Sequence, residues 1–235
     1  MSLARAIRDR TRNFRRRFQD PKKFVKTDEL SGQTQFELLK LDGCKPTSSV
    51  LEHGCGCLHM GVPLMQYLGS GQYAGIDPNA WLRTKAMKNP PTGQLVKEKQ
   101  PRFLTRQDFD ARELGMKFDF IYSHSVLSHA AHKQLDQYIA NSAAVLNPDG
   151  HILSSIRLAD GNAFGSVGNP DGGDSMDEHW VYPGVSWFTM QTVEQFAAKH
   201  GLKAERKPQY TEFLTSKKPN EFHDWVVLTW QDSGT

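Results

Sequence analysis

The sequence predicts an α/β protein with a mainly parallel sheet covered by helices on both faces. Three observations support this fold class: a glycine-rich turn after a short apolar strand, an acid at the end of the next strand, and five alternations of strand and helix between residues 50 and 156. Alternating units of this kind give parallel sheets because each helix returns the chain to the same edge. Ligands then bind beyond the carboxyl ends of the strands.

The stretch Val50–Cys57 is predicted to be a strand and a tight turn, followed by a helix on the amphipathic pattern from Leu58 to Leu68. Gly54 and Gly56 allow unusual dihedrals and bring bare backbone close to a ligand, and a following helix presents unpaired N–H groups. The next strand ends at Asp77, about 20 residues beyond the turn, where a βαβ unit places a carboxylate for both hydroxyls of a ribose. The turn is therefore interpreted as a cofactor cradle.

Further strands are expected to bring more polar side chains to the same edge. A strand over 102–106 is followed by Asp108 and Phe109, which are suited to bind an adenine amino group and to cover its ring; an ordinary turn is the alternative for Asp108. A strand over 118–122 runs into a segment with two histidines. Strands over 151–156, 203–210 and 224–230 follow. The edge residues so predicted are Glu52, Asp77, Asp108, His124 and His129.

Helices are expected between these strands, with one long interruption. A helix opened by Pro78 is predicted to end at Pro90–Pro91, and Thr189 is predicted to cap a helix that ends near Gly201. Residues 158–186 are rich in turn formers, and a loop of this length is typical of a lid, a binding segment or disorder. Its acids do not match a calcium loop, so we predict no metal site there. They are Asp160, Asp171, Asp174 and Asp177.

Length and composition favour one domain with an appendage. The 235 residues allow one substantial core. No apolar run approaches the roughly 20 residues that span a bilayer, and no secretory signal is evident. The three cysteines, Cys44, Cys55 and Cys57, have neither a disulfide framework nor zinc-site spacing. We therefore expect a cytoplasmic protein with reduced thiols.

The appendage is a basic, amphipathic segment over residues 1–30, ahead of a domain over 31–235. Residues 1–26 carry ten Lys and Arg against Asp9 and Asp20, a net +8, whereas the whole chain is only +3. The segment is expected either to pack on the domain as a helix or to bind an anionic partner. An anionic membrane surface, a phosphate-bearing substrate and nucleic acid are the alternatives, and a transit peptide is another reading.

These motifs together resemble the class I S-adenosylmethionine-dependent methyltransferases, from about Ser31 to Trp230. Glu52-x-Gly54-x-Gly56 resembles the first motif of that family, and Ile76-Asp77-Pro78 resembles its ribose-binding acid. Asp108-Phe109 is similar to its adenine motif. Residues 67–82 and 180–184 resemble a bacterial group often associated with sugar or glycan pathways. One departure is Leu58, which stands where the family has a third glycine; Gly61 is the candidate to relieve the same crowding.

The resemblance implies a Rossmann-like sheet of seven strands, the last antiparallel, and S-adenosylmethionine as cofactor with S-adenosylhomocysteine as product. The cofactor would lie over Gly54 and Gly56, with its ribose on Asp77 and its adenine by Asp108 and Phe109. Its methionine end would lie near Glu52 and Ser123. The implied cofactor residues are Glu52, Gly54, Gly56, Asp77, Pro78, Asp108, Phe109 and Ser123.

The chemistry expected is in-line methyl transfer to a hydroxyl of a small molecule or of a saccharide or glycan intermediate. Such a transfer needs alignment, exclusion of water and, for a hydroxyl, a base. His129 is the first choice because related enzymes have a histidine in a similar context; ordering of the loop is its alternative role. His124 and His179 are the other candidates. Trp180, Tyr182 and Trp187 are expected either to wall the acceptor site or to pin the loop.

Three other functions stay open. A nicotinamide-dependent oxidoreductase also uses Gly-x-Gly and a distant acid, although the glycine three residues after Gly56 is missing. A nucleic-acid methyltransferase is disfavoured because residues 123–126, Ser-His-Ser-Val, are not the aromatic tetrapeptide of amino-methylating enzymes. The third is a non-catalytic protein that binds the cofactor in the same fold. The sequence does not fix the oligomeric state.

Overall fold

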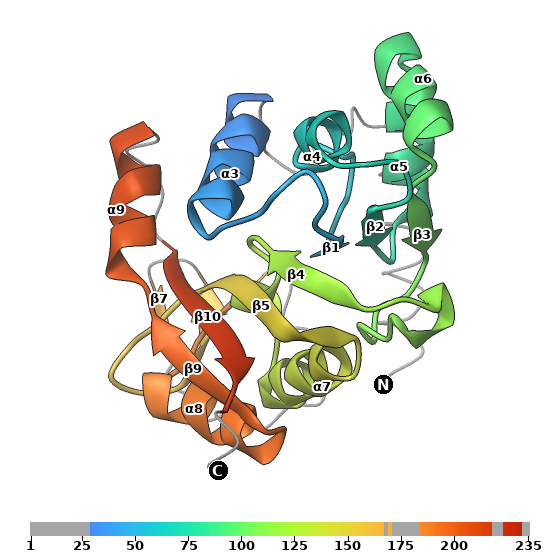
Figure 1. Cartoon of the computed structure of the whole chain (residues 1–235). Coiled ribbons are helices and arrows are strands. Elements are labelled where there is room, and N and C mark those ends of the chain that lie inside the picture. The colour runs from blue at the N-terminus through green and yellow to red at the C-terminus, as the bar shows by residue number, and fades with distance from the viewer. Residues whose placement is uncertain (1–28, 167–168, 171–183, 218–222, 232–235) are drawn as a thin grey trace, which may run out of the picture.

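The computed structural model describes residues 29–166, 169–170, 184–217 and 223–231 (Figure 1). The basic segment 1–26 lies outside these residues. The strands of the main sheet are β1 (Val50–His53), β2 (Tyr73–Ile76), β3 (Arg102–Leu104), β4 (Phe118–Ser123), β5 (Leu146–Ile156), β9 (Leu202–Arg206) and β10 (Asp224–Trp230). The helices are α3 (Glu29–Leu41), α4 (Gly61–Tyr67), α5 (Ala80–Met87), α6 (Pro90–Lys99), α7 (His132–Ala143), α8 (Met190–Lys199) and α9 (Pro208–Lys217).

The seven strands form one sheet in the order β3-β2-β1-β4-β5-β10-β9. Neighbours from β3 to β5 are parallel, whereas β10 is antiparallel to both β5 and β9. The predicted mostly parallel sheet of seven strands with an antiparallel last strand is therefore confirmed. Strands β1 to β3 follow one another toward one edge of the sheet, and β4 and β5 follow toward the other edge. The carboxyl ends of β1 and β4 are therefore the topological switch point, where ligands of such sheets bind.

Helices cover both faces of this sheet, as predicted. In Figure 1, α3, α4 and α9 lie on one side and α7 and α8 on the other. Successive side chains of β1 point to opposite faces of the sheet, so Val50 packs into one hydrophobic cluster and Leu51 into the other. The same alternation turns Glu52 toward Tyr73 and turns His53 toward Tyr138 of α7. Within the described residues, no helix is both long and apolar enough to cross a membrane.

The structure departs from the predicted elements at two prolines. Pro90 does not only follow the end of α5 at Met87: it is also the first residue of α6, a position where its missing N–H costs nothing and its φ suits a helix. The strand predicted over 203–210 ends at Arg206. Pro208 then begins α9, which buries Leu214 against the sheet.

The long loop predicted over 158–186 contains regular structure where it is described. β6 (Ala163–Ser166) pairs antiparallel with β7 (Asn169–Pro170) and with β8 (Val185–Trp187), in a second sheet of three strands. Phe164 anchors this small sheet, since its ring packs edge-on at 6.0 Å from Phe188 and belongs to the main core. Residues 171–183 lie outside the description, so its predicted role as a lid stays a prediction.

Candidate functional site

The glycine turn after β1 is pinned to the end of β2. The backbone N–H groups of Gly54 and Cys55 both donate to the carbonyl of Ile76, at 2.7 and 3.2 Å. Gly54 has φ +77°, and a Cβ atom there would lie 2.5 Å from Cγ2 of Val126. Only glycine fits such a position without strain, because both the dihedral and the space exclude a side chain.

Leu58 takes the left-handed conformation that a third glycine would take freely. Its φ is +65° and its side chain is fully buried, so the strain is held by packing. Gly61 lets α4 approach β2 closely: a Cβ there would lie 2.6 Å from the hydroxyl of Tyr73 and 3.2 Å from Cδ2 of Leu58. The helix after the turn begins at Gly61 and not at Leu58, so α4 starts later than predicted.

Asp77 lies against the glycine turn, which brings these two predicted features together. Its Oδ2 accepts the N–H of Gly56 at 3.0 Å, and its Oδ1 accepts the N–H of Asn79 at 2.6 Å. The side chain is buried, and burial raises the pKa of its carboxyl, against the lowering effect of those two N–H groups. Each carboxylate oxygen has a second lone pair, so Asp77 keeps acceptor capacity for ligand hydroxyls.

Glu52 is the second carboxylate beside the turn. It is buried, and the hydroxyl of Tyr73 donates to its Oε2 at 2.5 Å. Burial raises the pKa of Glu52 to about 7, helped by the negative charge of Asp77 and opposed by the Tyr73 hydrogen bond. Ser123, at the end of the adjacent strand β4, pairs with His53 in the register and is also fully buried.

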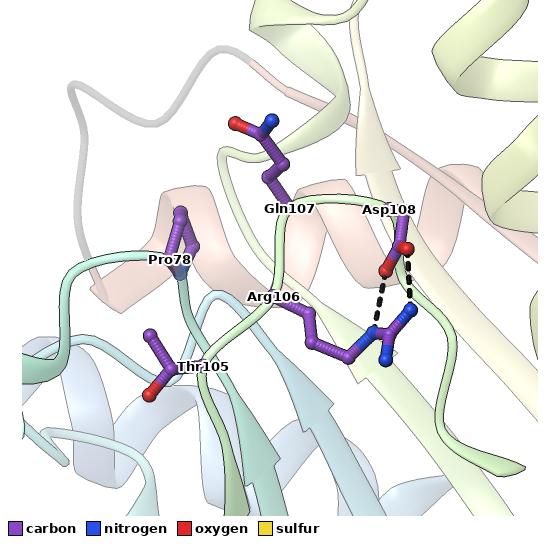
Figure 2. A pocket seen from close by; sticks show the side chains of 5 residues that line it. All are labelled: Pro78, Thr105, Arg106, Gln107 and Asp108. Atoms are coloured by element: carbon purple, nitrogen blue, oxygen red, sulfur yellow. Dashed lines mark hydrogen bonds and ion pairs between the residues drawn. The ribbon is translucent and has the colours of Figure 1, made fainter. Parts of the chain in front are cut away.

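A depression of about 460 Å³ opens beyond the ends of β2 and β3, lined by Pro78, Thr105, Arg106, Gln107 and Asp108. Figure 2 shows the side chains of Arg106 and Asp108 pointing toward one another in its lining. The guanidinium donates through Nε at 2.8 Å and through Nη2 at 2.6 Å, one bond to each oxygen of Asp108. This pairing lowers the pKa of Asp108, so the carboxylate is charged. Two predicted cofactor residues, Pro78 and Asp108, thus line one depression.

Phe109 lies in the core beneath the depression. Its ring is buried and packs edge-on against His53 at 5.4 Å and against Tyr138 at 5.1 Å. Its φ of +61° directs the backbone around this buried ring. The amide of Asn141, in α7, also donates to the backbone carbonyl of Asp108 at 2.7 Å. Phe109 therefore anchors the loop from below and is not among the residues that line the depression.

His124 lies beyond the end of β4 in an aromatic cluster that the sequence did not predict. Its ring stacks on Trp225 at 5.9 Å and meets His223 edge-on at 5.2 Å. The side-chain amide nitrogen of Gln35, in α3, lies 3.1 Å from its Nδ1. β10 is antiparallel to its neighbours, so its first residues reach the carboxyl edge, a placement that residue spacing alone does not reveal.

His129 lies on the other side of the same edge, in the short turn η2 (Leu127–His129). Its Nδ1 is 2.6 Å from the carbonyl oxygen of Gly184, just before β8. Burial lowers the pKa of His129, more than the Gly184 hydrogen bond raises it. The hydroxyl of Ser186 also donates to the carbonyl of Ala130 at 2.5 Å, which ties β8 to this turn.

The predicted acceptor residues are only partly described. Trp187 is half-buried in β8, with the guanidinium of Arg157 5.6 Å from its ring centroid. His179, Trp180 and Tyr182 lie outside the described residues, as do Asp171, Asp174 and Asp177. Among the residues that are described, no group of three or more acidic, histidine or cysteine side chains is arranged to hold a metal ion.

The sheet order and the glycine turn facing a carboxylate define the architecture of class I methyltransferases. The profile of a family described as "Methyltransferase domain" matches residues 9–207, and the chain belongs to this family. The predictions of a class I S-adenosylmethionine-dependent methyltransferase and of its cofactor are thereby confirmed. The predicted roles of individual residues stay predictions.

Solved structures share the fold at low sequence identity. Magnesium protoporphyrin IX methyltransferase from Synechocystis PCC 6803, solved with bound SAM, is 18% identical with a TM-score of 0.58, over 94% of this chain and 91% of that one. The glycopeptide N-methyltransferase MtfA is 11% identical with a TM-score of 0.61, over 87% and 91%. DesVI from Streptomyces venezuelae is 17% identical with a TM-score of 0.57, over 88% and 94%.

Proposed function

We propose that this protein transfers a methyl group from S-adenosylmethionine to a hydroxyl of a small molecule, with a saccharide or glycan intermediate as the favoured acceptor. The observation that carries the proposal is the meeting of Gly56, Asp77 and the Asp108 depression at one edge of the sheet. Carboxylates accept hydrogen bonds from ribose hydroxyls and from an adenine amino group, so these two acceptors fit an adenosyl ligand. When bound, the sulfonium supplies an activated methyl group.

One group of residues would hold the adenosine and another the methionine end of the cofactor. In the first group, Asp77 would accept hydrogen bonds from the ribose hydroxyls, and Asp108 with Pro78 would border the adenine. In the second group, Gly54 and Gly56 would give the ligand access to backbone, and Glu52 and Ser123 would lie near the methionine. Phe109 contributes by fixing the loop that carries Asp108, since its own ring is used in the core.

The hydrogen bonds of the two described histidines favour His129 as the base. When its Nδ1–H donates to the Gly184 carbonyl, neutral His129 has its lone pair on Nε2. In His124 the Gln35 amide donates to Nδ1, so the neutral ring has its proton on Nε2. Burial also lowers the pKa of His129, which keeps it neutral at physiological pH. His129 is thus arranged to accept a proton and His124 to donate one; His179 stays a third candidate.

The acceptor class rests on chemistry and not on the fold. The neighbours are named for porphyrin and glycopeptide acceptors, and one is an N-methyltransferase, so the shared fold serves several acceptors and atoms. Saccharide acceptors linked to nucleotide or lipid carry phosphate, which would pair with the ten basic residues of 1–26. The same segment would bring the enzyme to an anionic membrane surface if the acceptor is lipid-linked.

Calorimetry and a methyl-transfer assay test the proposal. The full chain should bind S-adenosylhomocysteine at micromolar concentration and should not bind NAD; the reverse result would overturn the cofactor assignment. Labelled S-adenosylmethionine is then offered with free, nucleotide-linked and lipid-linked saccharides, and with RNA and DNA. Labelling of nucleic acid in place of saccharides would refute the acceptor class. Cofactor binding without turnover on any acceptor would favour a non-catalytic binding protein.

A further inference from the structure

The depression beside β3 contains a feature that the cofactor assignment does not use. Arg106 lines it together with Asp108, and its guanidinium bonds to both oxygens of that carboxylate. Arg106 is further surrounded by acids, with Nη1 3.6 Å from Glu113 and Nη2 4.0 Å from Asp110. The arginine is thus held in the lining by carboxylates on three sides, although its side chain is about one-third exposed, at 35%.

The carboxylate of Asp108 is restrained from three directions. The buried Phe109 ring and the Asn141 amide fix its backbone, and Arg106 fixes the rotation of its side chain. Its remaining acceptor capacity can be counted. A carboxylate has about four lone-pair sites. Arg106 takes one on each oxygen, and the N–H of Asp110 takes a second on Oδ1 at 3.3 Å. Among hydrogen bonds from other described residues, Oδ2 accepts one, from Arg106, so it keeps a site whose direction the ion pair sets; the N–H of Asp108 itself also faces the carboxylate.

We infer that Arg106 is a positioning residue that makes Asp108 selective for the 6-amino group of the adenine, an inference that rests on the proposed cofactor site. A charged carboxylate with one directed lone pair accepts an N–H and repels a carbonyl oxygen. Preorganisation of this kind increases the difference in affinity between the two ligands, because the carboxylate does not have to reorient on binding. Without Arg106 the carboxylate is free to rotate, and that difference should shrink.

The experiment compares two ligands that differ in the substituent at C6 of the purine and, with it, in whether N1 carries a proton. S-adenosylhomocysteine carries the 6-amino group, whereas S-inosylhomocysteine carries a carbonyl there. Titration calorimetry on the full chain should show a preference of about ten- to a hundredfold for the adenosyl compound, the range of one hydrogen bond to a charged group. Arg106→Gln should reduce this preference to within about threefold, chiefly by weakening the adenosyl compound.

The same loop offers a matched control. Arg112 and Asp110 form the same bidentate pair, with Nε 2.9 Å from Oδ1 and Nη2 2.6 Å from Oδ2, but neither lines the depression. Arg112→Gln should keep the full preference. Arg106→Lys, which keeps the charge and loses the fork geometry, should give an intermediate ratio. Thermal unfolding of each variant separates loss of fold from loss of selectivity.

The outcomes that overturn the inference differ from those that overturn the proposed function. Absence of S-adenosylhomocysteine binding in the unmodified chain refutes the cofactor site itself. Equal binding of the two compounds by the unmodified chain refutes selectivity at Asp108 and leaves the cofactor assignment intact. A full preference in folded Arg106→Gln, or an equal loss in Arg112→Gln, refutes the role of Arg106.

Discussion

The two ends of the candidate site are built in different ways. At the adenosine end, several polar side chains bond to near neighbours in the sequence: Arg106 and Asp108 are two residues apart, and Asp77 accepts the N–H of Asn79 as well as that of Gly56, 21 residues away. At the acceptor end, the partners come from distant segments. Gln35 and His124 are 89 residues apart, and His129 and Gly184 are 55 apart. One end is set by local motifs, and the other depends on the completed fold.

This difference predicts where substitutions act. Changes at the adenosine end should alter cofactor affinity and leave the acceptor chemistry in place. Changes at the acceptor end should alter turnover and leave cofactor affinity in place. This division would fail if a change at the adenosine end altered turnover alone, or if a change at the acceptor end altered cofactor affinity.

The largest effect is expected for His129→Ala. Loss of a general base should lower kcat by about a hundredfold or more. Affinity for S-adenosylhomocysteine, measured by calorimetry, should be unchanged. Gln35→Ala, which removes the amide from His124, is the companion variant and should lower kcat far less. Near-normal turnover in His129→Ala would return His129 to a structural role that orders the loop through Gly184.

Asp77→Ala should have the next largest effect, and on affinity alone. Loss of the ribose contacts should weaken cofactor binding by about 1–3 kcal/mol. Because Asp77 also accepts two backbone N–H groups, its unfolding temperature should be recorded in parallel with the titration. Unchanged affinity in a folded variant would remove Asp77 from the cofactor site.

A pair of glycine substitutions tests whether the turn is closed to side chains. Gly71 has φ +76°, nearly the value of Gly54, yet nothing lies within 4 Å of a Cβ there. Gly71→Ala should therefore report the backbone strain alone, about 1–2 kcal/mol. Gly54→Ala adds the contact with Val126, which should cost about 1–3 kcal/mol more by overpacking. Denaturant unfolding measures both, and equal losses would show that Val126 yields without cost.

The smallest expected effect concerns pH. Burial lowers the pKa of His129, so its base form persists below the ordinary histidine pKa of about 6.5. The acid limb of the kcat/KM profile should therefore fall below pH 6.5 and not at or above it. The limb should be absent from the residual activity of His129→Ala. An acid limb centred above pH 7 would point to another group as the base.

The sequence predicted the adenosine end well because its signals are local. Gly54, Gly56 and Asp77 follow from strand ends and spacing, and the structure brings them together. The ion pair between Arg106 and Asp108 is not among the predictions, although an arginine two residues before an acid on a loop is a readable signal for such a pair. Phe109 shows a limit of the same reasoning: its motif position gives no indication that its ring points into the core.

The acceptor end was less predictable because its contacts are made by the chain topology. No spacing rule brings Gln35 to His124, or His223 to the same cluster; both contacts need α3 and the antiparallel β10 in place. The small sheet of β6, β7 and β8 was hidden in a stretch rich in turn formers. The sequence pattern does not reveal helix α9, because the strand predicted over 203–210 includes Pro208, which is instead the first residue of the helix.

The reversed direction of β10 has a practical consequence for handling the protein. Asp224 pairs with the last residue of β5 at the site edge, whereas Trp230 pairs with the first residue of β9 at the opposite edge. A fusion joined after Gln231 therefore departs from the side of the sheet remote from the cofactor turn. Tethering the enzyme to a sensor chip through a C-terminal tag should leave the binding edge turned toward the flowing solution.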